Sequence, residues 1–403
     1  MSAHPAMAFG ESFSRTAVVE DSAGMDVGRL ARLAEVIEED VLRGRYLGAN
    51  VVVARGGETA FRCSIGYATP EKDRPLREDD VFSIFSMTKA FTNLLVFRAI
   101  EQGHFALTTR ISDVIREFRN GLRERLTVYH LLTHTTGIPP IFVPRAGMYI
   151  DRLSEVVEAI CQVVQSEEEP GVKVNYSPMV AHALLGEMVR RVDAKRRTYR
   201  EIAVQDVFAP LGMADTWLGV RADLRARKII PHFLPTRAPM QHLGRSNLGE
   251  NGAFEEEEAE MPWVGAVSTL RDMHRFAEML RRGGELEGVR IVSRALLDRA
   301  TQNQTGDKPN ELYKKLALAR GWTPAPAYIG LGFSLRGDAI VEHQFGTLTS
   351  SRTFGNYGAG SMIYWVDPVR DLSFVALTTG VMHECDNIER FQRLADIAVS
   401  AVN

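Results

Sequence analysis

Hydrophobic residues recur at helical spacing soon after the chain begins. Leu30, Leu33, Ile37 and Val41 are three or four positions apart, which places their side chains on one face of a helix. Asp26 precedes them, and an aspartate there can accept hydrogen bonds from the unpaired N–H groups of the first helical turn. The pattern therefore predicts an amphipathic helix that starts after Asp26 and packs one side on a core.

Strand-like hydrophobic runs lie near both ends of the chain. Residues 48–68 contain two such runs around Gly56-Gly57, a pair that favours the tight turn of a two-residue hairpin. Three more strand patterns lie toward the C-terminus: residues 327–335, 359–368 and 371–380. A helix is expected after Asn387. The two groups of strands predict an antiparallel sheet built from both ends of the chain.

Helical periodicity dominates the middle of the chain. Residues 86–103 also have a helical pattern, and this pattern is apolar around much of the circumference, which predicts a buried helix. We therefore expect an α/β (α+β) fold, an antiparallel sheet flanked by helices with a mainly helical second lobe. The predicted units are an N-terminal lead-in of residues 1–25, a sheet lobe of residues 26–110 plus 320–403, and a helical lobe of residues 111–319.

Composition limits the class of protein. The 403 residues carry a formal charge of -3, and 45% are hydrophobic and 25% charged, which is ordinary globular composition and argues against disorder or a disulfide scaffold. The near-neutral charge argues against a nucleic-acid or polybasic membrane surface.

Cellular location is predicted from the cysteines and from the start of the chain. The three cysteines lie far apart in the sequence, at Cys63, Cys161 and Cys385, and one must be unpaired, which favours a reducing compartment. The first residues lack the basic and apolar regions of a signal peptide, and no run approaches the ~20 apolar residues of a membrane span. The sequence thus predicts a cytoplasmic protein that does not bind membranes.

Ser86 and Lys89 form the sharpest chemical signal. Three positions on a helix are nearly one turn, so the serine hydroxyl and the lysine amine share a face. Serine becomes a nucleophile when a base accepts its proton, and lysine can do this where burial lowers its pKa, whereas arginine cannot. Only eight of the 48 basic residues are lysines. The alternative is a helix-capping serine beside a lysine that extends to solvent.

The segments around this pair resemble the serine β-lactamase and penicillin-binding-protein superfamily, in particular class C β-lactamases and family VIII carboxylesterases. The resemblance runs from about residue 26 to the end and lies in six ordered blocks: residues 75–93, 126–138, 170–189, 208–216, 265–280 and 354–368. Ser-x-x-Lys is a known signature of the superfamily. The resemblance implies the β-lactamase-like fold, Ser86 as nucleophile with Lys89, and Tyr176 as the tyrosine that shares the proton with the lysine.

Other residues of the expected site also come from the resemblance. Ala359 matches the position whose N–H joins that of Ser86 in the oxyanion hole. Asn356, Tyr357 and Gly358 replace the Lys-Thr-Gly strand motif of the lactamases, and we expect them to contact substrate, Asn356 as a hydrogen-bond donor and Tyr357 as a pocket wall.

Two departures bear on the substrate. Pro178 stands where lactamases have a substrate-binding asparagine, and the lysine of the strand motif, which would meet a substrate carboxylate, is missing. Both departures argue against efficient β-lactam hydrolysis and toward simpler esters or amides.

The resulting expectation is a serine hydrolase that cleaves a carboxylic ester through an acyl-enzyme. The alternatives are a peptidase or amidase similar to D-aminopeptidases, an acyltransferase, a weak β-lactamase, and a non-catalytic binding protein on the same fold. No cofactor is expected. His130 and His134 are four residues apart, a spacing suited to zinc, but no third ligand is evident and no metal site is predicted. The expected partner is a small ester or amide, with no nucleic acid; the sequence leaves the oligomeric state open.

Overall fold

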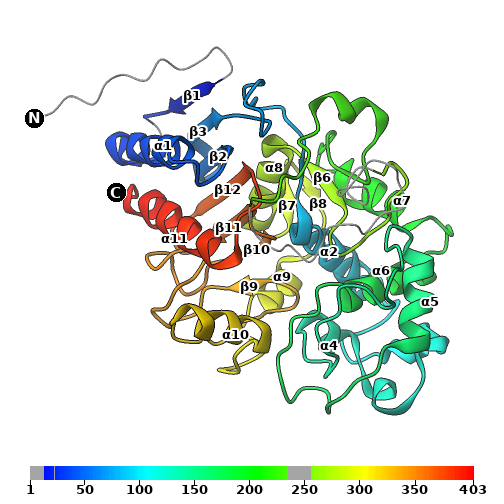
Figure 1. The fold of residues 1–403 in the computed structure, drawn as a ribbon. Helices are drawn as coiled ribbons and strands as arrows, with labels where there is room; N and C mark the ends of the chain where they lie inside the picture. The colour runs from blue at the N-terminus through cyan, green and yellow to red at the C-terminus, as the bar shows by residue number, and fades with distance from the viewer. Residues whose placement is uncertain (1–12, 22, 235–255) are drawn as a thin grey trace, which may run out of the picture.

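The fold is built around a seven-stranded antiparallel sheet whose strands come from both ends of the chain (Figure 1). The computed structural model describes residues 13–21, 23–234 and 256–403. From edge to edge, the strands are β1 (Ser14–Val19), β3 (Glu58–Gly66), β2 (Gly48–Arg55), β12 (Leu372–Thr379), β11 (Met362–Asp367), β10 (Phe354–Gly358) and β9 (Ser334–Leu335). The two groups of strands meet between β2 and β12, where Val52 lies opposite Val375. The predicted antiparallel sheet is thereby confirmed.

The predicted hairpin joins β2 and β3. Gly56 and Gly57 have φ values of +63° and +93°, a left-handed conformation that residues with a side chain adopt at a cost. The two strands pair on either side of this turn. Strands β11 and β12 also lie within their predicted segments.

Two segments differ from their predicted structure. Only Ser334–Leu335 of residues 327–335 forms a strand, because the backbone turns at Tyr328 (φ +43°) and Gly332 (φ +79°). Strand β1 lies within the predicted lead-in, of which residues 1–12 and 22 lie outside the described residues. Its short run has no strong pattern of its own, and it is extended because it pairs with β3.

Helices α1 (Val27–Leu42) and α11 (Glu384–Ser400) cover one face of the sheet (Figure 1). The Asp26 side chain accepts a hydrogen bond from the Arg29 N–H, so the predicted cap is present. The two helices share a core with the side chains on that face, including Phe374 and Trp365, whose rings stack 5.1 Å apart. The expected C-terminal helix is thus present and starts three residues before Asn387.

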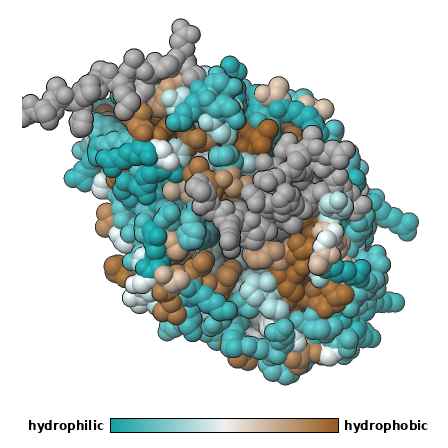
Figure 2. Space-filling view, viewed as in Figure 1, coloured by the Kyte–Doolittle hydropathy of each residue, from teal (hydrophilic) through white to brown (hydrophobic). Residues whose placement is uncertain are grey.

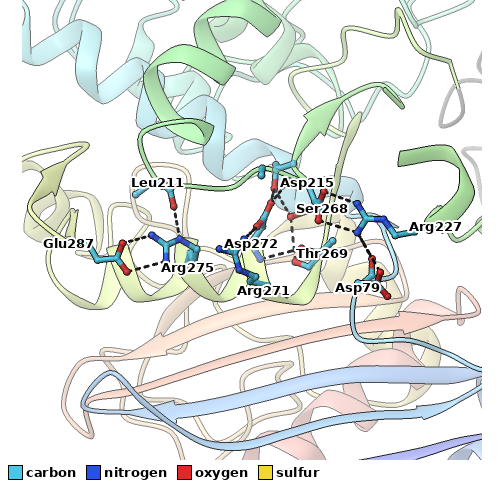
Figure 3. Close-up of polar contacts among 12 residues, drawn as sticks. Asp79, Leu211, Asp215, Arg227, Ser268, Thr269, Arg271, Asp272, Arg275 and Glu287 are labelled. Atoms are coloured by element: carbon cyan, nitrogen blue, oxygen red, sulfur yellow. Dashed lines mark hydrogen bonds and ion pairs between the residues drawn. The ribbon is translucent and has the colours of Figure 1, made fainter. Parts of the chain in front are cut away.

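Helix α8 (Leu270–Arg281) packs on the opposite face of the sheet. A polar network, shown in Figure 3, holds its first turn. The Asp272 carboxylate accepts hydrogen bonds from the Asp215 N–H (2.8 Å) and the Thr216 hydroxyl (3.0 Å), and Arg227 pairs with Asp215 at 2.7 Å. Since residues 263–268 lead directly into α8, this network also helps to fix the chain segment behind the site described below. Helix α8 belongs to the segment assigned to the helical lobe, and the division into lobes stays a prediction.

The remaining elements pack beside the sheet, with the predicted buried helix α2 (Thr88–Glu101) between the sheet and the other helices (Figure 1). Eleven residues of α2 are buried, on all sides of the helix, and its main helical contact is α6 (Val180–Val192). The other helices are α3 (Ile111–Val114), α4 (Val128–Leu132), α5 (Leu153–Val163), α7 (Tyr199–Ala203), α9 (Arg294–Ala300) and α10 (Glu311–Arg320). Short strands form a three-stranded sheet, β4 (Phe82–Ser83), β6 (Ala266–Ser268) and β5 (Trp217–Leu218), and a hairpin, β7 (Glu285–Leu286) and β8 (Val289–Arg290).

Hydrophilic residues cover most of the face shown in Figure 2, and hydrophobic residues gather there in separate patches. None of the helices in the described ranges combines the length and the apolar character needed to cross a bilayer.

Candidate active site

Ser86 lies at a sharp turn between strand β4 and helix α2. The turn is one 3₁₀ segment, Phe85–Met87, and Phe85 has a φ of +47°, a conformation that is costly for a bulky residue and that marks functional turns. Among residues 81–97, Ser86 is the one that is not fully buried. The turn therefore presents the Ser86 hydroxyl to the surface of a cavity while its neighbours anchor the chain in the core.

Lys89 reaches back to Ser86 from the first turn of α2. Its Nζ donates hydrogen bonds to Ser86 Oγ at 3.0 Å and to the carbonyl oxygen of Trp263 at 2.8 Å. The side chain is 3% exposed, and no carboxylate pairs with it among the described residues. Burial lowers the pKa of Lys89 well below its ordinary value, because a buried ammonium without a counter-charge is unfavourable. The environment thus favours the neutral amine, the form that can accept a proton.

Tyr176 completes the contacts of Ser86. Its hydroxyl donates a hydrogen bond to Ser86 Oγ at 3.0 Å, and the Lys89 amine lies 5.2 Å from the centre of the tyrosine ring. Burial raises the pKa of Tyr176 above its ordinary value, so the phenol retains its proton. The structure thus brings together the serine, lysine and tyrosine that the sequence singled out, although they come from two segments 90 residues apart.

A buried shell behind the three residues holds Tyr176 in place. The His134 ring packs on the Tyr176 ring at 5.0 Å, and its Nδ1 accepts a hydrogen bond from the Ser177 N–H at 3.2 Å. Burial and, less strongly, the nearby Lys89 lower the pKa of His134 to about 3. His182 packs on His134 and bonds to the Asn93 amide at 3.0 Å. His134 and His182 are therefore neutral supports; in the sequence, His134 was considered only for its zinc spacing, and no pattern singled out His182.

The zinc spacing of His130 and His134 is not realised. Helix α4 ends at Leu132, and His134 follows it with a left-handed φ of +53°, so the two rings do not share a helical face. Across residues 13–21, 23–234 and 256–403, no group of three or more histidine, cysteine, aspartate or glutamate side chains is placed to bind a metal.

Strand β10 approaches the serine turn closely. A Cβ on Gly358 would lie 2.5 Å from the Ile84 carbonyl oxygen, so a residue with a side chain would push the strand away from the turn. Ala359 follows directly and lines the same cavity as Ser86. Gly358 thus lets the backbone beside Ala359 lie near the serine, the arrangement that a two-amide oxyanion hole requires.

Asn356 and Tyr357 precede Gly358. The Asn356 side chain is hydrogen-bonded within the protein, whereas Tyr357 lies in the cavity wall. The Asn356 amide donates to the Gly332 carbonyl at 3.0 Å and accepts from the Tyr364 hydroxyl at 2.6 Å. It is therefore engaged within the protein, and its predicted donation to substrate stays a prediction. Tyr357 lines the cavity, as expected, and its buried hydroxyl has no hydrogen-bond partner among the described residues.

The cavity above Ser86 has a volume of about 520 Å³, which suits a small organic molecule. Ser86, Lys89, Tyr176 and Pro178 all line it. Much of its remaining wall is apolar and comes from α10 and the segments on either side of it, including Leu312, Leu316, Trp322, Pro326, Ile329 and Phe333. A carbonyl compound with an apolar substituent would fit such a space.

Comparisons with known proteins support the family resemblance of the sequence. The sequence profile of the family described as "Beta-lactamase" matches residues 33–398. Esterase EstB from Burkholderia gladioli is 36% identical over 146 residues, which are 35% of this chain and 36% of EstB. The chain aligns with about a third of the length of the curated relatives it matches.

Solved structures resemble the whole fold. A penicillin-binding protein homologue from Caulobacter crescentus superposes with a TM-score of 0.75 at 23% identity, covering 95% of this chain and 98% of that one. A family VIII carboxylesterase superposes with a TM-score of 0.73 at 20% identity, covering 93% and 99%. At these identities the likeness is one of fold, and it confirms the predicted β-lactamase-like architecture.

Proposed function

The chain belongs to the beta-lactamase family, and from this premise we propose that it is a serine hydrolase that cleaves carboxylic esters through an acyl-enzyme. The observation that carries the proposal is the contact of Ser86 Oγ with both Lys89 Nζ and the Tyr176 hydroxyl, each at 3.0 Å. A nucleophile within reach of a base and of a second proton carrier is what acyl transfer needs.

In acylation, the Lys89 amine accepts the Ser86 proton while Oγ attacks the ester carbonyl. Burial favours the neutral amine over the ammonium, so Lys89 fits the role of base better than a surface lysine. The carbonyl oxygen becomes an oxyanion, which we assign to the N–H groups of Ser86 and Ala359. The N-terminal end of α2 adds a favourable dipole at this point.

Tyr176 carries the proton to the leaving group. When the tetrahedral intermediate collapses, the Tyr176 phenol donates a proton to the departing alkoxide. It regains a proton from the Lys89 ammonium. The raised pKa of Tyr176 supports this role, because the phenol is protonated when the alkoxide leaves. In deacylation, water takes the place of the alcohol. Tyr176 accepts a proton from the attacking water while it passes its own proton to Lys89, and the Lys89 ammonium returns a proton to Ser86 Oγ as the acid departs.

Esters are favoured over β-lactams by two features of the cavity wall. Pro178 lines the cavity where the lactamases have an amide side chain, and proline offers no side-chain donor. Asn356 stands in place of the motif lysine and is bonded to Gly332 and Tyr364. The name of EstB, an esterase, points the same way. Amide or peptide hydrolysis, acyl transfer to an alcohol and weak β-lactamase activity would use the same groups and are the alternatives.

The test compares wild type with Ser86→Ala on p-nitrophenyl acetate and butyrate and on nitrocefin, together with labelling by a fluorophosphonate. We expect the wild type to hydrolyse the esters, to take up one phosphonate at Ser86 and to turn over nitrocefin poorly. Ester turnover that survives in Ser86→Ala, or phosphonate attached elsewhere, would refute the proposal. Rapid nitrocefin turnover would replace ester with lactam as the substrate class, and complete inactivity would favour a binding protein.

We also propose a reducing compartment such as the cytoplasm. Cys63, Cys161 and Cys385 are all free thiols in the structure, which is the usual state of cysteines there.

A further inference from the structure

A second polar pair lies in the wall of the same cavity. Tyr313, on α10, donates a hydrogen bond from its hydroxyl to Glu384 Oε1 at 3.0 Å, and Glu384 is the first residue of α11. The Tyr313 ring lies 6.2 Å from the Tyr176 ring, edge to face. Both residues line the cavity. A carboxyl group therefore stands one aromatic ring away from the proposed catalytic tyrosine.

The position of this pair is set by the surrounding backbone. Asn310 caps α10 by accepting the Leu312 N–H at 3.1 Å, and the same oxygen accepts the Tyr176 N–H at 3.4 Å. The start of α10 is thereby attached to the catalytic tyrosine segment. Because Tyr313 is one turn further along α10, its hydroxyl and Glu384 keep a defined distance from Ser86.

No cationic side chain among the described residues pairs with Glu384. Its neighbours Asp386 and Glu389 pair with Arg320 at 2.7 and 3.3 Å, but none of the ion pairs among the described residues includes Glu384. Its second oxygen, Oε2, has no hydrogen bond there either. Glu384 is also not the cap of α11, because the His383 side chain accepts the Cys385 N–H. Capping and ion pairing thus do not account for this carboxyl. The N-terminal end of α11 favours an acid in its first turn, but it does not require a side chain that lines the cavity.

No cation among the described residues neutralises Glu384 in the cavity wall. Burial raises the pKa of Glu384 to about 7, and the hydrogen bond from Tyr313 partly opposes this rise. Part of the group is therefore protonated at neutral pH, and a cation bound beside it would favour the carboxylate. The cavity contains two lysines: burial favours the neutral form of Lys89, and Lys314 lies 3.8 Å from Glu311. A partly desolvated carboxylate with a free oxygen is a recognition group for a cation.

We propose that Glu384, oriented by Tyr313, binds a positively charged ammonium group of the substrate, so that the cavity selects cationic compounds over carboxylates. This inference rests on the proposed function for its meaning as substrate selection, but the binding it describes can be measured without turnover. It also accounts for the missing motif lysine: the cavity presents an acid without a cationic partner among the described residues, and the substrate would supply the cation.

Binding is tested with three probes of one shape, namely benzylammonium, benzyl alcohol and benzoate, titrated by calorimetry into Ser86→Ala at pH 8. We expect benzylammonium to bind about tenfold or more tightly than benzoate, the size expected of a hydrogen bond to a charged group. Glu384→Gln in the same background should bring the ratio close to one. Glu389→Gln is the matched control on the same helix and should leave the ratio unchanged, because its carboxylate faces Arg320.

Turnover is tested with butyrylcholine and its neutral isostere 3,3-dimethylbutyl butyrate, through the ratio of their kcat/KM values in wild type and in Glu384→Gln. We expect the ratio to favour the choline ester and to fall about fivefold in the variant, because a trimethylammonium group offers a charge without an N–H donor and is attracted by the Coulombic interaction alone. Because a ratio is unaffected by the fraction of folded enzyme, partial misfolding does not obscure it. If Glu384→Gln does not fold, the wild-type probe ratio and Tyr313→Phe, which should weaken the preference, decide the question.

The outcomes separate the two proposals. Equal binding of the three probes by an enzyme that hydrolyses p-nitrophenyl esters would overturn cation recognition and leave the esterase intact. A cation preference that depends on Glu384 in a protein without ester turnover would overturn the esterase and leave the binding site. An equal loss of turnover on both butyrate esters in Glu384→Gln would show that Glu384 only positions Tyr176, and the inference would be wrong.

Discussion

Lys89→Met is the change that most directly tests whether the lysine is the base. Methionine has nearly the length of lysine and keeps the apolar contacts of α2, but it cannot accept the Ser86 proton. Loss of a positioned general base lowers kcat/KM by about 10²–10⁴-fold. Lys89→Arg should be equally inactive, because a guanidinium does not give up its proton in a protein.

The same substitution makes a prediction about stability, because burial lowers the pKa of Lys89 in the folded protein. In the unfolded chain the lysine titrates near pH 10.4. Between the folded-state pKa and that value, the unfolded chain holds one proton more than the folded protein. The free energy of unfolding of wild type therefore rises with pH in this window, by about 1.4 kcal/mol per pH unit for this one group.

Lys89→Met lacks this titration, so the difference between the two proteins isolates it. The variant also leaves the Trp263 carbonyl without the 2.8 Å bond from Nζ, a loss of about 1–3 kcal/mol, but that loss does not depend on pH. Relative to the variant, wild type should therefore gain about 1.4 kcal/mol for each pH unit above the folded-state pKa.

Urea unfolding of both proteins at pH 7.5, 8.5 and 9.5 measures this difference, since other groups titrate equally in both and cancel. If the difference in free energy of unfolding grows with pH, its onset also gives the pKa of Lys89 in the folded protein. Below that pKa the difference does not change with pH. A difference that stays constant over the whole range would mean that folded Lys89 keeps its proton as the unfolded chain does. Lys89 could then not be the base, and the reasoning from burial would be wrong.

Three further predictions concern the neighbours of Lys89 and the core. Tyr176→Phe keeps the ring and removes the hydroxyl at 3.0 Å from Ser86. The kcat/KM for esters should therefore fall about 10²–10⁴-fold, with little change in melting temperature. Activity near that of wild type would exclude Tyr176 as the proton carrier. Gly358→Ala places a Cβ 2.5 Å from the Ile84 carbonyl oxygen. Thermal unfolding should show a loss of stability of about 1–3 kcal/mol, and phosphonate labelling should show slower acylation. An unchanged labelling rate would mean that β10 does not set the oxyanion geometry. Burial raises the pKa of Cys63 to about 12, so iodoacetamide at pH 8 should label it in urea but not in the native protein, and rapid native labelling would contradict its placement in the core.

Local chemistry accounts for the parts of the fold that the sequence predicted. The Asp26 cap, the Gly56-Gly57 turn and the helical spacing of Ser86 and Lys89 each depend on residues within about one turn of one another, so the pattern of a short segment is enough to predict them. The apolar circumference of residues 88–101 likewise predicts burial, whatever packs around it. The resemblance of six blocks added Tyr176, which no local pattern distinguishes from a core tyrosine.

Tertiary structure decided the rest, because those features depend on partners far away in the sequence. Strand β1 exists through its pairing with β3, and residues 327–335 bend because Gly332 approaches Asn93 on α2. The neutral state of His134 follows from burial, which no spacing predicts.

The same holds for the charge inside the cavity. Glu384 lies 71 residues from Tyr313, and in the sequence it is one acid among 51 acidic residues. The sequence alone determined which groups can move a proton from Ser86. Only the folded chain, by excluding water and bringing distant groups together, decided which of them are neutral and which line the cavity.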